Sequence, residues 1–81
     1  MLNEVKGLLR DTLQLGDRAA SFDRDTRLLG SLPELDSMAV VTVITALEER
    51  FGITVDDDDI SAETFETVGS LVRYVEERLA A

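Results

Sequence analysis

Residues 36–52 read DSMAVVTVITALEERFG and form the most apolar helical pattern in the chain. Apolar residues recur at helical spacing on one broad face, namely Met38, Val41, Ile44, Leu47 and Phe51. Asp36 belongs to the residue types that cap helix N-termini, and Gly52 to those that end helices. The segment therefore predicts a helix over 37–51. Val40 and Val43 widen its apolar surface, so either the helix is central or part of it faces a partner.

Two further amphipathic patterns flank this segment. From Leu2 to Leu15 the apolar residues fall near helical spacing, with Asn3 as a candidate cap and Gly16 as a stop. Thr67 is the candidate cap of the clearest pattern, which repeats at i, i+3, i+4, i+7 and i+11. The repeating residues are Val68, Leu71, Val72, Val75 and Leu79. Both patterns predict helices.

The connections between the expected helices differ in character. Residues 17–36 form a long first loop, and Pro33 prevents a helix from running through it. Its apolar anchors predict that it packs over the bundle; they are Phe22, Leu28, Leu29 and Leu32. After the four aspartates of Asp56–Asp59 we expect a short third helix that begins at Ser61 and holds Phe65. No strand alternation or repeat appears, so we predict an all-α fold, an irregular four-helix bundle.

The composition restricts the function. At 81 residues, 44% hydrophobic and 31% charged, the chain is expected to form a single domain over 1–81. It contains no cysteine and no histidine, so it lacks disulfides, ordinary zinc ligands and the commonest general base. No apolar run reaches the roughly 20 residues that cross a bilayer, and no secretory signal pattern appears. We expect a cytoplasmic protein that does not insert into membranes.

The negative charge is concentrated in the middle of the chain. Seventeen acidic and eight basic residues give a net charge of −9. Between residues 31 and 66 lie ten of the acidic residues and a single basic one, Arg50, so the whole net charge falls in this segment. Such a surface repels nucleic acid and favours basic partners.

The Asp36-Ser37 pair stands where the long loop enters the second helix. Helix N-termini present unpaired N–H groups and a positive dipole end, which favour a phosphate. An isolated Asp-Ser pair before a helix is more often a simple cap. The dipeptide by itself therefore does not identify a modification site.

Its surroundings resemble acyl carrier proteins in element order, chain length and two segments. These segments are Leu35-Asp36-Ser37-Met38 and Ala46-Leu47-Glu48-Glu49-Arg50-Phe51-Gly52-Ile53. In that family the serine of an Asp-Ser-Leu motif receives phosphopantetheine. The resemblance thus implies Ser37 as the covalent attachment residue, with Asp36 beside it. Met38 replaces the leucine, a volume-conserving change.

The resemblance implies a carrier rather than an enzyme, with no catalytic residue and no metal site. It would hold acyl intermediates as thioesters on a phosphopantetheine arm and present them to enzymes of fatty acid or specialised lipid and polyketide biosynthesis. Its partners would be a phosphopantetheinyl transferase (holo-acyl carrier protein synthase), which transfers the arm from coenzyme A, and acyl-loading, elongating and acyl-transferring enzymes with basic docking patches. We expect a monomer.

Candidate partner-binding residues lie on the second helix and in the acidic stretch after it. Met38 and Val41 would add apolar contact. The acidic candidates, which would steer basic patches toward the arm, are Glu48, Glu49, Asp57 and Asp58. The family's second helix often carries an acidic residue near its middle, where this chain has Thr42 and Thr45. Because of this departure, the resemblance does not indicate which partner enzymes dock.

Two alternatives remain open. Aminoacyl, peptidyl or D-alanyl carriers share the arm and the fold but differ in cargo. An unmodified helical interaction module would offer the apolar second helix to a partner groove, and its mass would never change.

Overall fold

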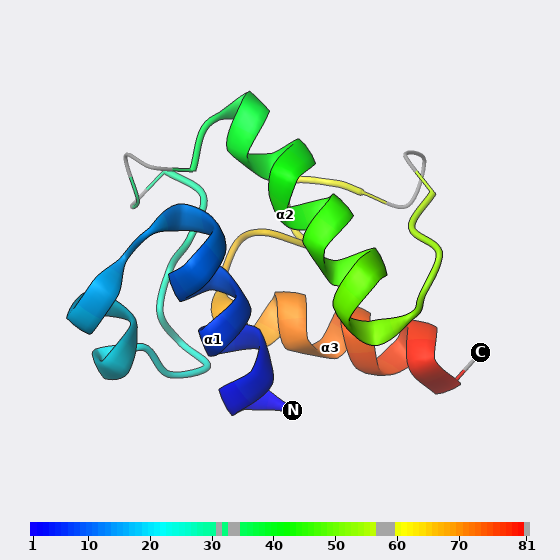
Figure 1. The fold of residues 1–81 in the computed structure, drawn as a ribbon, viewed down its shortest axis with the longest axis horizontal. Coiled ribbons are helices and arrows are strands. Elements are labelled where there is room, and N and C mark those ends of the chain that lie inside the picture. The colour runs from blue at the N-terminus through cyan, green and yellow to red at the C-terminus, as the bar shows by residue number, and fades with distance from the viewer. Residues whose placement is uncertain (31, 33–34, 57–59, 81) are drawn as a thin grey trace.

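Helices joined by two long connections make up the fold, which the computed structural model describes for residues 1–30, 32, 35–56 and 60–80. Within those residues the helical elements are α1 (Leu2–Leu13), the 3₁₀-helix η1 (Gly16–Ser21), α2 (Ser37–Phe51) and α3 (Val68–Ala80). α1 packs against both α2 and α3, and α2 crosses above α3 in Figure 1. The all-α prediction is confirmed.

All three α-helices and the first long connection contribute to one hydrophobic core. The helices supply Val5, Leu8, Leu9, Leu13, Val43, Leu47, Val68, Leu71, Val72 and Val75. The long first connection supplies Leu15, Ala19, Phe22, Leu28, Leu32 and Leu35, and Phe65 comes from the turn before α3. Each large apolar side chain buried in this way stabilises the fold by roughly 1.5–3 kcal/mol. The prediction that the first loop packs over the bundle is confirmed.

Four apolar residues do not occupy the core positions that their spacing predicts. Leu29 and Leu79 are 42% and 46% exposed, and Met38 and Val41 are exposed to a still greater extent. In α2 the fully buried residues are Val43 and Leu47, so the face of α2 that meets the rest of the fold is centred on these two residues. The wide apolar pattern of this helix therefore divides between the core and the surface.

Side-chain caps set the start of α2 and of α3 as predicted. Asp36 Oδ1 accepts a hydrogen bond from the Ala39 N–H at 2.8 Å. Before α3, Thr67 Oγ1 accepts from the Ser70 N–H and Ser70 Oγ accepts from the Thr67 N–H, both at 3.0 Å. These reciprocal bonds satisfy backbone donors that a helix start leaves unpaired. Gly52, at φ 66°, ends α2.

The ends of α1 differ from the prediction. The helix begins at Leu2, with Met1 at the N-cap position, so Asn3 is not the cap. It ends at Leu13 because Gln14 adopts the left-handed conformation at φ 55° and donates its N–H to the Arg10 carbonyl. Gly16 starts η1 and does not stop α1. This early turn brings Leu15 into the core, where it is 4% exposed.

The predicted short helix at residues 61–65 is a pair of hydrogen-bonded turns. The Thr64 N–H donates to the Ser61 carbonyl, and the Glu66 N–H donates to the Glu63 carbonyl. The carbonyl oxygens of Phe65 and Glu66 accept hydrogen bonds from the first loop, both at 2.9 Å. Pairing with a distant segment thus takes the place of helical pairing. The short helix of this fold is η1, within the first connection.

The first loop is joined to the start of α3 by backbone hydrogen bonds. The N–H groups of Leu28 and Leu29 donate to residues 66 and 65, and those of Val68 and Gly69 donate to the carbonyls of Thr26 and Arg24. Arg27 and Thr67 form an antiparallel bridge. Leu28, Leu32 and Leu35 then lead the chain, through buried side chains, to the start of α2. Among the described helices none is long and apolar enough to cross a membrane.

Candidate functional site

Ser37 is the first residue of α2 and is exposed, and α2 begins at the top of the view in Figure 1. Capping is performed by the neighbouring carboxylate of Asp36, which binds the Ala39 N–H. The Ser37 hydroxyl has no hydrogen-bond partner among the described residues. A role for Ser37 as the cap is therefore not needed to explain its position, and its oxygen is open to a reaction partner.

Contacts made by the residues before and after Ser37 fix its position. On one side, Leu35 is buried and its N–H donates to the Leu32 carbonyl at 3.1 Å. On the other, the first turn of α2 closes with the Val40 N–H donating to the Asp36 carbonyl at 2.9 Å. The hydroxyl is thus held on an anchored helix start. The unpaired N–H groups and the dipole of that helix end favour a phosphate attached there.

The exposed face of α2 continues away from Ser37 through apolar and then polar residues. Met38 is 75% exposed and Val41 is 58% exposed. Thr42 and Thr45 are also exposed, and each hydroxyl donates to the carbonyl four residues earlier, at 3.1 Å. Glu49 lies exposed further along the same helix. Along α2, apolar side chains therefore lie nearest to Ser37, and the negative charge of Glu49 lies further away.

The other acidic candidates are placed differently from Glu49. Glu48 is half-buried, and its Oε2 accepts a hydrogen bond from the Val55 N–H at 3.1 Å. Asp57 and Asp58 lie outside the described residues. The structure thus brings Ser37, Asp36, Met38, Val41 and Glu49 onto exposed positions of one element, whereas Glu48 is engaged with the following loop.

An apolar cavity that the sequence reasoning missed opens beside α2, one turn after Ser37. It has a volume of about 320 Å³ and is lined by Leu29, Val40, Ile60, Ser61, Ala62 and Phe65. The lining comes from the first loop, from α2 and from the turns at 61–65. Apolar surface on Val40 beyond the needs of a buried stripe was the one signal in the sequence that pointed to it.

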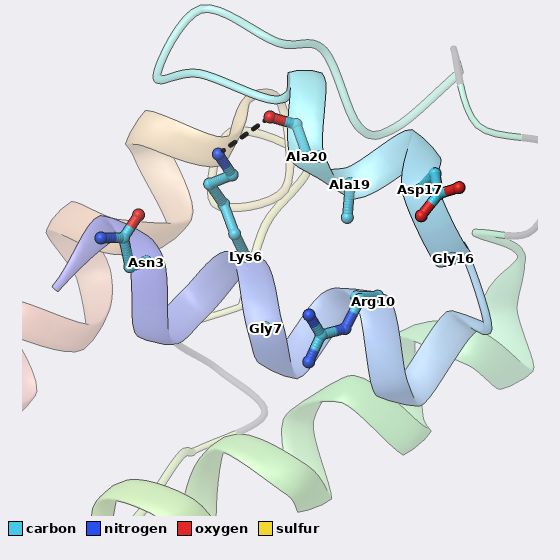
Figure 2. A pocket seen from close by; sticks show the side chains of 8 residues that line it. All are labelled: Asn3, Lys6, Gly7, Arg10, Gly16, Asp17, Ala19 and Ala20. Carbon is cyan, nitrogen blue, oxygen red and sulfur yellow. Dashed lines mark hydrogen bonds between the residues drawn. The ribbon is translucent and has the colours of Figure 1, made fainter.

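A larger hollow of about 500 Å³ lies between α1 and η1. Its rim carries charged side chains, including Lys6, Arg10 and Asp17. Figure 2 shows Lys6 spanning from α1 to η1, where its Nζ donates to the Ala20 carbonyl at 3.4 Å. No residue of α2 lines this hollow, so it is separate from the Ser37 region. Within the part of the chain that the structure describes, no group of three or more carboxylates could hold a metal ion.

Comparison with known families supports a carrier function. The sequence model of a family described as "Phosphopantetheine attachment site" matches residues 3–75. This range contains Ser37, the whole of α2, all of α1 except Leu2, and most of α3. Because the match covers most of the chain, the family relationship concerns most of the helical arrangement and not the Asp-Ser dipeptide alone.

Curated relatives and a solved structure agree with that match. The chain is similar to the acyl carrier protein of Beutenbergia cavernae, at 32% identity over 93% of this chain and 77% of the relative. It is likewise similar to that of Chlamydia trachomatis, at 33% identity over 94% of this chain and 92% of the relative. The solution structure of holo acyl carrier protein from Nitrosomonas europaea is 56% identical, with a TM-score of 0.92 over 99% of this chain and 96% of that one.

Proposed function

This chain belongs to the acyl carrier protein family, whose members carry acyl groups on phosphopantetheine, and we propose that Ser37 is the residue to which the arm is attached. The observation that carries the proposal is an exposed serine hydroxyl at the start of α2 whose capping role is taken by Asp36. Fatty acid biosynthesis is the role typical of proteins with this name.

The residues around Ser37 fit the attached group. The hydroxyl lies at a helix N-terminus, where a phosphodiester is electrostatically favoured. When bound, the arm supplies the thiol that forms the acyl thioester, and the chain itself has no cysteine that could do so. Asp36 holds the first turn of α2 closed, and Ser37 in that turn is exposed and therefore open to the transferase.

In this proposal Ser37 is a substrate and not a catalyst. Its oxygen forms a new bond to the phosphorus of the phosphopantetheinyl group of coenzyme A. The bond from that phosphorus to the bridging oxygen of the pyrophosphate breaks, and adenosine 3′,5′-bisphosphate leaves. The proton of the hydroxyl passes to the transferase or to water. The described part of the chain needs no general base for this step, because the partner enzyme brings it.

The exposed face of α2 supports the assignment of partner-binding residues. Met38 and Val41 offer apolar contact beside Ser37, and Glu49 offers negative charge to a basic patch. Asp57 and Asp58 belong to the same proposal on grounds of sequence. The enzymes bound would be a phosphopantetheinyl transferase and acyl-loading, elongating and acyl-transferring enzymes, acting on a cytoplasmic monomer.

The apolar cavity beside α2 favours acyl cargo over aminoacyl or peptidyl cargo. Its lining includes Val40, Ile60 and Phe65, which offer no charged partner to an ammonium group. A hydrocarbon chain gains free energy when it enters such a site, whereas an unpaired charge is disfavoured there. We therefore propose that part of the acyl chain lies in this cavity.

The decisive test is the intact mass after incubation with coenzyme A, magnesium and a promiscuous phosphopantetheinyl transferase. The wild-type chain should gain one arm, and Ser37→Ala should gain none while keeping its helical circular dichroism. Ser61→Ala removes another exposed serine hydroxyl and should be modified as fully as the wild type. An unchanged wild-type mass, or modification of Ser37→Ala, would refute the assignment.

A further inference from the structure

The peptide group between Thr54 and Val55 is hydrogen-bonded on both edges by charged side chains. Glu48 Oε2, on α2, accepts from the Val55 N–H at 3.1 Å. Arg78 Nε, in the last turn of α3, donates to the Thr54 carbonyl at 3.1 Å. That carbonyl and that N–H belong to one planar amide. A carboxylate and a guanidinium from two different helices thus bind opposite edges of a single peptide group. We call this arrangement the clamp.

The two bonds reinforce each other through the amide. Hydrogen bonds to ionised groups are roughly twice as strong as neutral ones. A carboxylate that accepts from the N–H polarises the amide and makes its carbonyl a better acceptor for the guanidinium. Residues 53–56 have no regular structure of their own. Besides the packing of Ile53 against the core, these two side chains tie the segment to the helices. In Figure 1 the chain leaves α2 beside the last turns of α3.

We infer that Glu48 and Arg78 are positioning residues, and that together they hold the segment after α2 against the C-terminal ends of α2 and α3. Glu48 then serves the docking of partner enzymes by placing this segment, and Glu49 serves it by its charge. The contrast rests on the different settings of the two carboxylates, because Glu48 is half-buried and engaged, whereas Glu49 is exposed and has no partner among the described residues. The docking part of the inference depends on the proposed carrier function.

Amide hydrogen exchange, measured by NMR on the unmodified chain, tests the clamp directly. Glu48→Ala and Arg78→Ala should each speed exchange of the Val55 N–H by about tenfold or more, since each removes a charged hydrogen-bond partner. Glu48→Gln keeps an acceptor oxygen and should restore most of the protection. Glu49→Ala and Arg73→Ala are matched controls on the same two helices and should leave Val55 unchanged. Exchange at Val55 that responds no more to the first pair than to the controls would overturn the clamp.

Arm transfer at low salt tests the docking part. Glu48→Gln and Glu49→Gln each remove one negative charge. Glu49→Gln should raise the KM of the transferase reaction several-fold with little change in kcat, whereas Glu48→Gln should stay close to the wild type. Equal effects of the two variants would show that Glu48 acts by charge and would overturn this part. A wild-type chain that accepts no arm would defeat the carrier assignment, whereas the exchange result at Val55 would still decide whether the clamp exists.

Discussion

Gly69, in the first turn of α3, lies directly against the backbone carbonyl of Arg24 in the first loop. Its N–H donates to that carbonyl at 2.9 Å, and a Cβ built on Gly69 would come within 2.7 Å of the same oxygen. This close approach joins the first loop to α3. The loop then continues through Leu28 and Leu35 to the start of α2, so the contact helps to place Ser37.

Gly69→Ala should therefore destabilise the fold by about 1–3 kcal/mol, because the clash involves backbone that cannot move aside. Gly7→Ala, in α1, is the matched control, since its new Cβ would meet only the Arg50 side chain at 3.9 Å. There the better helix propensity of alanine should raise stability by about 0.5–1 kcal/mol. Urea unfolding followed by circular dichroism measures both, and shifts in the same direction would contradict the contact.

Removing the cap of α2 should weaken both the fold and the placement of the reactive hydroxyl. Asp36→Ala loses the hydrogen bond to the Ala39 N–H and should cost about 0.5–2 kcal/mol of stability. Asp36→Asn keeps a capping oxygen and should retain most of it. We expect arm transfer to Ser37 to fall further in the alanine variant than in the asparagine variant. Equal losses in the two variants, both of which lack the negative charge, would show that the charge, and not the cap, is what matters at Asp36.

Salt should slow the reaction with basic enzymes. The net charge of −9 and the exposed Glu49 speed association, and ions screen that attraction over about 8–10 Å at physiological strength. Raising the ionic strength, or the Glu49→Lys change, should lower kcat/KM for arm transfer with little effect on the unfolding midpoint, because exposed charges contribute little stability. Equal rates at low and high salt would exclude electrostatic steering.

Apolar cargo should stabilise the folded carrier. An octanoyl group that enters the cavity beside Val40 and Phe65 binds only the folded state and should raise the melting temperature above that of the unloaded arm-bearing form. A glycyl thioester on the same arm should leave the melting temperature unchanged. Differential scanning calorimetry of the three forms makes the comparison, and a larger increase with glycyl would favour the aminoacyl alternative.

The parts of the fold that depend on local chemistry were predictable. Asp36 and Thr67 cap their helices through hydrogen bonds that span three residues, and Gly52 ends α2 at a positive φ. The predicted short helix at residues 61–65 was wrong: the segment forms two turns, and the carbonyls of Phe65 and of the following Glu66 pair with the first loop. Gln14 ended α1 early for a similar reason, since the turn brings Leu15 into the core. Neither outcome is encoded in the neighbouring residues.

By itself, the sequence determined where the second helix begins, that an aspartate and a serine stand at its start, and that the negative charge gathers in the middle of the chain. Those properties follow from residue types at short spacing. Only the tertiary structure decided that Ser37 is exposed, with no hydrogen-bond partner for its hydroxyl among the residues described. It also decided that Val40 borders a cavity and that Glu48 and Arg78 meet on one peptide group. Such features arise where segments far apart in the chain are packed together, and packing depends on the whole fold.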